Sequence, residues 1–309
     1  MQNGRPSSTA LLIAKSTCLL SRDPRYRHLI PPETAKICDR FVMAASPGGI
    51  RFLRATHSGW FRAAAIFMER LILPGIMIHY TLRKRFIEES VRERLKDGVR
   101  QVIMLGAGFD TLAYRLQREF PDVAFIELDH PATQRVKVEV LSGALSPNLA
   151  YLSLDISTRD PSEVLLRCPA YDPNDETILI AEGLLMYLDA TAVGTIIELA
   201  AQHQGRSAII FTFMEPRKDG QIAFQHSGKL VDWWLKRRGE PFQWGIRRED
   251  LSDYLSQHGL DLERIVAPDE LRVEYLPEPV RDGSRHANGD YICVARTRLT
   301  RAISRPTIL

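Results

Sequence analysis

The chain has 309 residues, of which 45% are hydrophobic and 26% are charged, a composition typical of soluble globular proteins. Its 41 basic and 38 acidic residues are nearly balanced, which argues against a nucleic-acid-binding protein. The four cysteines lie far apart without a C-x-x-C pair, so the sequence predicts no metal site and no disulfide framework, and favours a reducing cytoplasm.

The first 98 residues predict an N-terminal helical extension. Its first apolar stretch, Ala10 to Ala14, is cut by Lys15 and is too short for a signal sequence, and nothing approaches a membrane span, so we expect no membrane contact. Helices are expected over residues 10–20, 33–45, 50–73 (one or two short ones) and 76–96, separated by segments rich in proline and glycine.

From residue 99 onward, apolar strands alternate with helices. We expect strands at 101–105, 123–128, 150–154, 177–181 and 207–213, with helices at 111–120, 131–141 and 190–204 and a weak helix and loop over 161–175. Because crossover connections are right-handed, this alternation predicts parallel strands. Ligands of such sheets bind at the carboxyl ends of the strands.

The alternation stops after the fifth strand. An insertion is expected at about 215–246, in a position to cover the ligand, with a tryptophan-containing helix over 225–238. A helix over 248–258 and two late strands, 260–267 and 291–297, complete the second predicted domain, residues 99–309. The two late strands predict an antiparallel hairpin at the sheet edge, with a long loop (268–288) between them.

A glycine turn follows the first strand, in the segment Gly106-Ala-Gly108-Phe-Asp110. Glycine lets a ligand lie against bare backbone, and the acid Asp129 at the end of the next strand can bind two ribose hydroxyls. The nicotinamide fingerprint needs a third glycine, where this chain has Thr111. An acid beside the turn suits the ammonium and sulfonium of S-adenosylmethionine better than a pyrophosphate. The sequence therefore favours S-adenosylmethionine, with an NAD(P)-dependent oxidoreductase as the alternative.

Three segments resemble a known family. They are 102–116 (VIMLGAGFDTLAYRL), 125–131 (FIELDHP, with Lys137) and 181–188 (AEGLLMYL), and they resemble the leucine carboxyl methyltransferase or PPM-type family, in its bacterial branch of small-molecule O-methyltransferases. Residues 82–88 and 239–246 resemble further segments of that branch. The resemblance, which covers roughly residues 75–265, implies a class I methyltransferase fold of α/β class. That fold is a Rossmann-like doubly wound sheet, mostly parallel, with a C-terminal antiparallel edge hairpin, N-terminal helices and a helical cap.

The resemblance also implies roles at the nucleoside end of the cofactor. Gly106 and Gly108 would bring backbone to its methionine part, and Asp129 would accept hydrogen bonds from the ribose hydroxyls. Asp155 and Ile156 would border the adenine, with the acid accepting from its amino group.

Three charged residues would surround the amino-acid end. Glu182 would face it, and Arg83 would pair with its carboxylate in a charge-assisted contact. Asp110 would either contact the cofactor amine or cap the following helix.

Structural alternatives stay open for these acids and for the arginine. Asp129 could be a helix N-cap, Asp155 a turn residue and Glu182 a surface acid, while Arg83 could lie on a solvated helix face. Glu127 lies within a strand, where burial without a partner would cost several kcal/mol. We therefore expect it either to face solvent or to be hydrogen-bonded near the glycine turn.

The resemblance implies an O-methyltransferase acting on a small-molecule acceptor. Methyl transfer from a sulfonium is an in-line displacement, so the protein supplies mainly proximity and orientation. A carboxylate acceptor needs no general base, whereas a hydroxyl usually does, and His79, Tyr187 and His226 are the candidates. Whether the acceptor oxygen belongs to a carboxylate or a hydroxyl stays open.

The acceptor is expected between the N-terminal helices and the 215–246 insertion. Four aromatic residues there would suit an apolar or aromatic acceptor or would simply pack the cap onto the sheet: Trp233, Trp234, Phe242 and Trp244. Amino-methylating nucleic-acid enzymes carry an Asn/Asp-Pro-Pro-aromatic run after the fourth strand, where this chain has Glu182-Gly-Leu-Leu. A non-catalytic module that keeps the fold remains a further alternative.

Overall fold

The computed structural model describes residues 4, 6–142, 146–203, 206–224, 241–278, 280 and 288–298. The N-terminal part forms the helices expected from the sequence, with two short helices where one or two were predicted. They are α1 (Ser8–Leu20), a 3₁₀ turn η1 (Arg27–Leu29), α2 (Pro32–Ala45), α3 (Gly49–Thr56), α4 (Gly59–Ile72) and the long α5 (Ile76–Lys96). The predicted helix over 225–238 lies outside the described residues.

A seven-stranded sheet in the order β3-β2-β1-β4-β5-β7-β6 forms the centre of the molecule. Its first five strands are parallel, whereas β7 runs antiparallel to both β5 and β6. The strands are β1 (Gln101–Leu105), β2 (Ala124–Asp129), β3 (Leu149–Ser153), β4 (Thr177–Ala181), β5 (Ala208–Met214), β6 (Leu260–Val266) and β7 (Asp290–Thr297). The predicted α/β class and the antiparallel edge hairpin are therefore confirmed.

Both faces of the sheet are buried, which explains the unbroken apolar runs of its central strands. Val102 and Met104 of β1 belong to one hydrophobic cluster, while Ile103 and Leu105 belong to another. The helices that connect or cover the strands are α6 (Leu112–Glu119), α7 (Pro131–Leu141), α8 (Pro161–Leu165), a 3₁₀ turn η3 (Leu185–Tyr187), α9 (Ala190–Gln202), α11 (Arg248–Gln257) and α12 (Pro268–Tyr275). The result is a doubly wound sheet.

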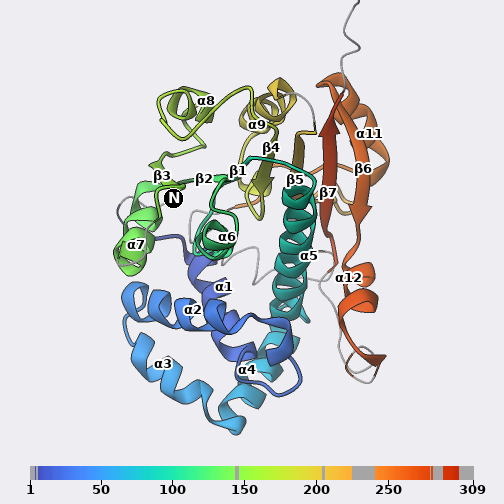
Figure 1. The fold of residues 1–309 in the computed structure, drawn as a ribbon. Helices are drawn as coiled ribbons and strands as arrows, with labels where there is room; N and C mark the ends of the chain where they lie inside the picture. The colour runs from blue at the N-terminus through green and yellow to red at the C-terminus, as the bar shows by residue number, and fades with distance from the viewer. Residues whose placement is uncertain are drawn as a thin grey trace, which may run out of the picture.

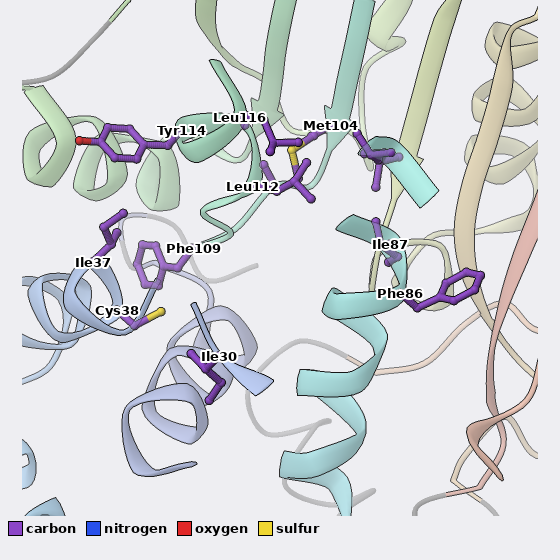
Figure 2. Close-up of a cluster of buried hydrophobic side chains, with 14 of the residues drawn as sticks. Ile30, Ile37, Cys38, Phe86, Ile87, Met104, Phe109, Leu112, Tyr114 and Leu116 are labelled. Atoms are coloured by element: carbon purple, nitrogen blue, oxygen red, sulfur yellow. The ribbon is translucent and has the colours of Figure 1, made fainter. Parts of the chain in front are cut away.

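The N-terminal helices share the core of one sheet face. Figure 1 shows α5 running alongside the sheet, with α1 to α4 gathered beneath it. Phe109 of the glycine turn stacks on Phe41 of α2, with ring centroids 4.8 Å apart, and it lies near Ile37 and Cys38 (Figure 2). The N-terminal helices thus support the glycine turn through this contact. The division of the chain into two domains at residue 98 stays a prediction.

The prediction of a long loop over 268–288 is wrong for the first part of that segment. Residues Pro268 to Tyr275 form α12, which begins with proline at its first position and with Glu270 accepting a hydrogen bond from the Ala267 amide at 3.1 Å. These helix-start signals were present in the sequence, but the position between two strands favoured a loop. Residue 279 and residues 281–287 lie outside the described part.

The expectation for Glu127 is also wrong. Its side chain is 1% exposed and pairs at 2.5 Å with Lys137 of α7, which is itself fully buried. Strand β2 is covered on this face by α7, so the carboxylate meets the lysine rather than solvent or the glycine turn. None of the described helices is both long enough and apolar enough to span a bilayer.

Candidate functional site

One cavity lies at the carboxyl ends of the parallel strands and brings together all eight residues that were predicted to bind the cofactor. They are Arg83, Gly106, Gly108, Asp110, Asp129, Asp155, Ile156 and Glu182. Its wall also includes residues of the first two helices, among them Ala10, Ile13 and Thr34. The acids and glycines come from the ends of four strands, whereas Arg83 comes from α5.

The turn after β1 requires glycine at its first position. Gly106 has φ +64°, and a Cβ built there would lie 2.8 Å from Cδ1 of Leu184. Its amide donates to the Leu128 carbonyl at 2.8 Å, which ties the turn to β2. A side chain at this position would therefore strain the backbone and displace Leu184 from the cavity wall.

Asp129 is held in place by two backbone amides. Oδ2 accepts a hydrogen bond from the Gly108 amide at 2.8 Å, and Oδ1 accepts one from the His130 amide at 2.7 Å. His130, rather than Asp129, caps α7, so the N-cap alternative for Asp129 is wrong. Burial raises the pKa of the Asp129 carboxyl to about 6, against the effect of the two amides and of Lys137. Each carboxylate oxygen keeps a lone pair for a further donor.

Asp155 and Ile156 line the same cavity beyond Asp129. Asp155 also stabilises a turn, as its structural alternative predicted, because its Oδ1 accepts hydrogen bonds from the amide and the hydroxyl of Ser157 at 3.1 and 2.6 Å. Ile156 is 7% exposed and packs in the apolar cluster on the sheet face opposite the N-terminal helices. The pair thus offers a carboxylate beside an apolar wall.

Arg83 and Glu182 form the charged end of the cavity. The arginine is 2% exposed, and its Nε donates to Oε1 of Glu182 at 2.9 Å. The alternatives of a solvated helix face for Arg83 and of a surface acid for Glu182 are therefore wrong. Gly183 follows with φ +63°, where a Cβ would lie 3.2 Å from Nη2 of Arg83. A glycine here leaves room for the guanidinium.

Lys84 links this end of the cavity to the glycine turn. Its Nζ pairs with Oδ2 of Asp110 and lies 3.1 Å from Oε2 of Glu182. Asp110 is not the N-cap of α6, which is Thr111, but its Oδ1 accepts from the amide of Leu112, the first residue of that helix, at 2.6 Å. Burial opposes ionisation of Asp110, but Lys84 and Lys137 hold the pKa of its carboxyl well below the usual range. Asp110 therefore satisfies one amide of the first turn of α6 from the position before the N-cap, and its carboxylate is charged beside the cavity.

Sequence reasoning missed Asp290, the first residue of β7. It is 1% exposed and lines the cavity, and its Oδ2 accepts from Nη1 of Arg83 at 2.6 Å and lies 2.8 Å from Nε2 of His79. Within the described part of the chain, its Oδ1 has no hydrogen-bond partner. The available signal was an acid at the start of the apolar run Tyr291-Ile-Cys-Val-Ala, but 207 residues separate it from Arg83.

A further part of the cavity wall is aromatic and apolar. Met186, Tyr187, Phe224 and Phe242 line it, with Phe242 in ring contact with both Tyr187 and Phe224. Trp244 instead packs against Tyr254 in the core, so it holds the chain onto the sheet.

Of the three candidate bases, only Tyr187 is seen to line the cavity, while His79 is buried against Asp290. Trp233, Trp234 and His226 lie outside the described residues. The cysteines Cys18, Cys38, Cys168 and Cys293 are all buried free thiols. Among the residues that the structure describes, no group of three or more His, Cys, Asp or Glu side chains could hold a metal ion.

Comparison with known proteins assigns this site to a family. Residues 14–201, more than half of the chain, match the family described as leucine carboxyl methyltransferase. The chain belongs to that family. The match spans α2 and α5, the glycine turn, Asp129 and Glu182, and so covers most of the cavity wall. The family predicted from the sequence is confirmed.

Curated relatives of this leucine carboxyl methyltransferase family member carry the description "Putative S-adenosyl-L-methionine-dependent methyltransferase". One from Mycolicibacterium smegmatis is 30% identical over 60% of this chain, and the chain matches 63% of that relative's length, less than two thirds. One from Mycobacterium ulcerans is 27% identical over 84% of both chains. These descriptions confirm the prediction that the cofactor of this class of methyltransferase is S-adenosylmethionine.

The fold recurs in a solved structure. A Thermobifida fusca protein, titled "putative methyltransferase", superposes with a TM-score of 0.56 over 96% of this chain and 97% of its own. Its sequence identity to this chain is 14%, so the likeness concerns the fold alone.

Proposed function

We propose that this member of the leucine carboxyl methyltransferase family is an O-methyltransferase. It transfers the methyl group of S-adenosylmethionine to a carboxylate or hydroxyl oxygen of a small apolar or aromatic molecule. The observation that supports this most is the continuity of one cavity, which runs from Asp155 and Asp129 past the charged end to the aromatic side chains of Tyr187, Phe224 and Phe242. The two ends offer a site for a donor and a site for an acceptor.

The charge of the cavity fits the amino-acid end of the cofactor. Arg83 and Lys84 face the three carboxylates of Asp110, Glu182 and Asp290, which leaves one negative charge in excess. The cofactor brings an ammonium, a sulfonium and a carboxylate, so its net charge is positive. Asp290 Oδ1, which lacks a partner among the described residues, would be an acceptor for the ammonium. Arg83 keeps guanidinium donors for the carboxylate.

The nucleoside end has the features that adenosine needs. Asp129 is already oriented by two amides, so little order is lost when it accepts from the ribose hydroxyls. Asp155 and Ile156 would border the adenine with a carboxylate acceptor and an apolar surface.

The acceptor would lie between α1 and the aromatic end. Ile13, Met186 and Phe242 exclude water there and position an apolar body. When bound, S-adenosylmethionine supplies a methyl group already activated by its sulfonium. The protein's own contribution is then to align the acceptor oxygen with that methyl group, and a carboxylate would need no proton removed.

A methyl-transfer assay tests the proposal directly. The purified chain is incubated with S-adenosylmethionine labelled in its methyl group and with a panel of aromatic carboxylates, phenols and amines. We expect label in an oxygen product, and base treatment separates the outcomes because esters release methanol whereas ethers do not. Transfer to amines alone would contradict the proposal. Tight cofactor binding without transfer to any acceptor would favour a non-catalytic binding module.

Cofactor affinity is expected to depend on the ionisation of Asp129. The carboxylate accepts from both ribose hydroxyls, and protonation removes one of those acceptors, so affinity should fall as the pH drops through about 6. One pH unit below that value, calorimetry should find S-adenosylhomocysteine bound about tenfold more weakly than at pH 8, by linkage. Asp129→Asn should lose roughly 1–3 kcal/mol of binding free energy at pH 8.

The same Asp129→Asn variant serves as the control for the pH effect. Its affinity should be nearly constant over this range. If it still weakens in acid, the buried carboxyl of Glu127, whose pKa is about 7, controls the titration instead and the ribose role of Asp129 is wrong.

A further inference from the structure

The outward face of α4 is apolar and exposed. Trp60 is 81% exposed, Phe67 61% and Leu71 66%, while Met68 and Ile72 are exposed by 52% and 49%. No residue of this 14-residue helix is buried. We call these five side chains the α4 stripe. Large apolar side chains seldom gather in this way on a surface that faces only water.

Helical spacing places the stripe on one side of α4, away from the protein. Positions 60, 67, 68 and 71 fall at i, i+7, i+8 and i+11, which share one helix face. The opposite side packs on the protein, because Ala65 and Ile66 contact the apolar core, while Phe61 at the boundary of the stripe contacts Phe52 of α3 edge to face. Figure 1 shows α3 and α4 in light blue at the end of the molecule farthest from the sheet, and no residue of α4 lines the cavity described above.

The segment that carries the stripe has an excess of positive charge. Residues 49–72, which include α3 and α4, contain four arginines, Arg51, Arg54, Arg62 and Arg70, and one acid. These 24 residues therefore have a local excess of three positive charges, whereas the rest of the chain has 37 basic and 37 acidic residues. Arg51, Arg54 and Arg70 are exposed.

The single acid of the segment is turned inward. Glu69 Oε1 accepts a hydrogen bond from the Met77 amide at 3.2 Å, at the start of α5. The surface that surrounds the stripe is therefore basic.

These features favour an anionic partner over a second copy of the chain. A two-fold interface through the stripe would place two basic surfaces against each other, at an electrostatic cost. Exposed tryptophan and phenylalanine flanked by arginines are typical of helices that lie in the interface of a bilayer.

We propose that the α4 stripe docks this protein on an anionic membrane surface. A helix of 14 residues is too short to span a bilayer, so α4 would lie along the interface, with its apolar side chains below the headgroups and its arginines among the phosphates. This differs from the expectation of no membrane contact, which considered only signal and spanning segments. The proposal does not depend on the reaction proposed above.

Vesicle flotation of the full chain tests this docking. We expect the protein to float with vesicles of phosphatidylcholine and phosphatidylglycerol, and to bind vesicles of phosphatidylcholine alone much more weakly. Phe67→Gln with Leu71→Gln should reduce binding about tenfold or more, because two large apolar side chains are lost. Arg51→Gln with Arg54→Gln should reduce binding to the anionic vesicles by a similar factor, and added salt should mimic that loss.

Matched controls come from exposed apolar residues elsewhere. Leu166 and Val273 are 69% and 62% exposed, and Leu166→Gln with Val273→Gln should leave flotation unchanged. Unchanged melting temperatures would show that the variants fold. Failure of the wild type to bind anionic vesicles would overturn the proposal, as would equal losses in the control variant. Self-association that only the α4 variant abolishes, without vesicle binding, would assign the stripe to a second copy instead.

Discussion

Replacement of Lys137 by methionine is expected to lower the free energy of unfolding by about 3–5 kcal/mol above pH 7, the usual range when one partner of a buried ion pair is removed. Lys137 of α7 is fully buried and lies 2.5 Å from the carboxylate of Glu127, which is 1% exposed. Methionine fills a similar volume but leaves the Glu127 carboxyl buried without its partner between strand and helix.

The loss should depend on pH in a defined direction. Burial already raises the pKa of Glu127 to about 7 against the attraction of Lys137. Since a raised carboxyl pKa favours the protonated form in the folded state, stability decreases as the pH rises from the unfolded value near 4.5 toward 7. Without Lys137 that pKa rises further, so the variant should be least affected near pH 5 and most affected at pH 8. Urea unfolding at the two pH values measures the difference.

The double variant Glu127→Leu with Lys137→Met is the control for the charge effect. Replacement of both members of a buried pair by apolar residues is often neutral, so most of the stability should return. If the double variant is as unstable as Lys137→Met, the lysine acts through packing and the charge argument is wrong. Lys137 also lowers the pKa of Asp129. The cofactor-binding midpoint near pH 6 should therefore move upward in the Lys137→Met variant.

The parts of the site that could be predicted are those that a local sequence pattern determines. Gly106 and Gly108 follow one buried strand, and Asp129 and Glu182 lie at the ends of two others. In a parallel sheet such residues lie at the carboxyl edge, however the rest of the chain folds. Local periodicity likewise predicted α5, although it did not show that Arg83 would be buried together with the apolar residues of that helix.

The rest depends on contacts that no local pattern encodes. Asp290 meets Arg83 only because β7 inserts between β5 and β6, and Lys137 meets Glu127 only because α7 crosses β2. The first turn of α1 reaches the cavity wall because the N-terminal helices fold back beneath the sheet. A solvated helix face was the structural alternative for Arg83, yet in Arg83-Lys84-Arg85 the first residue is buried and the second is paired with two acids.

Substitution of Arg83 is the second change with a large expected effect. The guanidinium is held by Glu182, by Asp290 and by the ring of Tyr80, whose centroid lies 5.1 Å away. Arg83→Met would leave two buried carboxylates short of a partner, and we expect a loss of about 3–5 kcal/mol in the free energy of unfolding. The pKa of Asp290, which Arg83 and His79 hold below its usual range against burial, should rise in this variant.

Arg83→Lys separates the structural role of this residue from its binding role. Lysine keeps the charge but lacks the planar fork, so it cannot pair with Glu182, Asp290 and a ligand carboxylate at once. If Arg83 binds the carboxylate of the cofactor, the variant should bind S-adenosylhomocysteine roughly 10- to 100-fold more weakly, the value of a hydrogen bond between charged groups. Methylthioadenosine has the same nucleoside but neither the carboxylate nor the ammonium, so its affinity should hardly change. Calorimetry with both ligands on the folded variant decides between the roles, because an equal loss for the two would mean that Arg83 only supports the shape of the cavity.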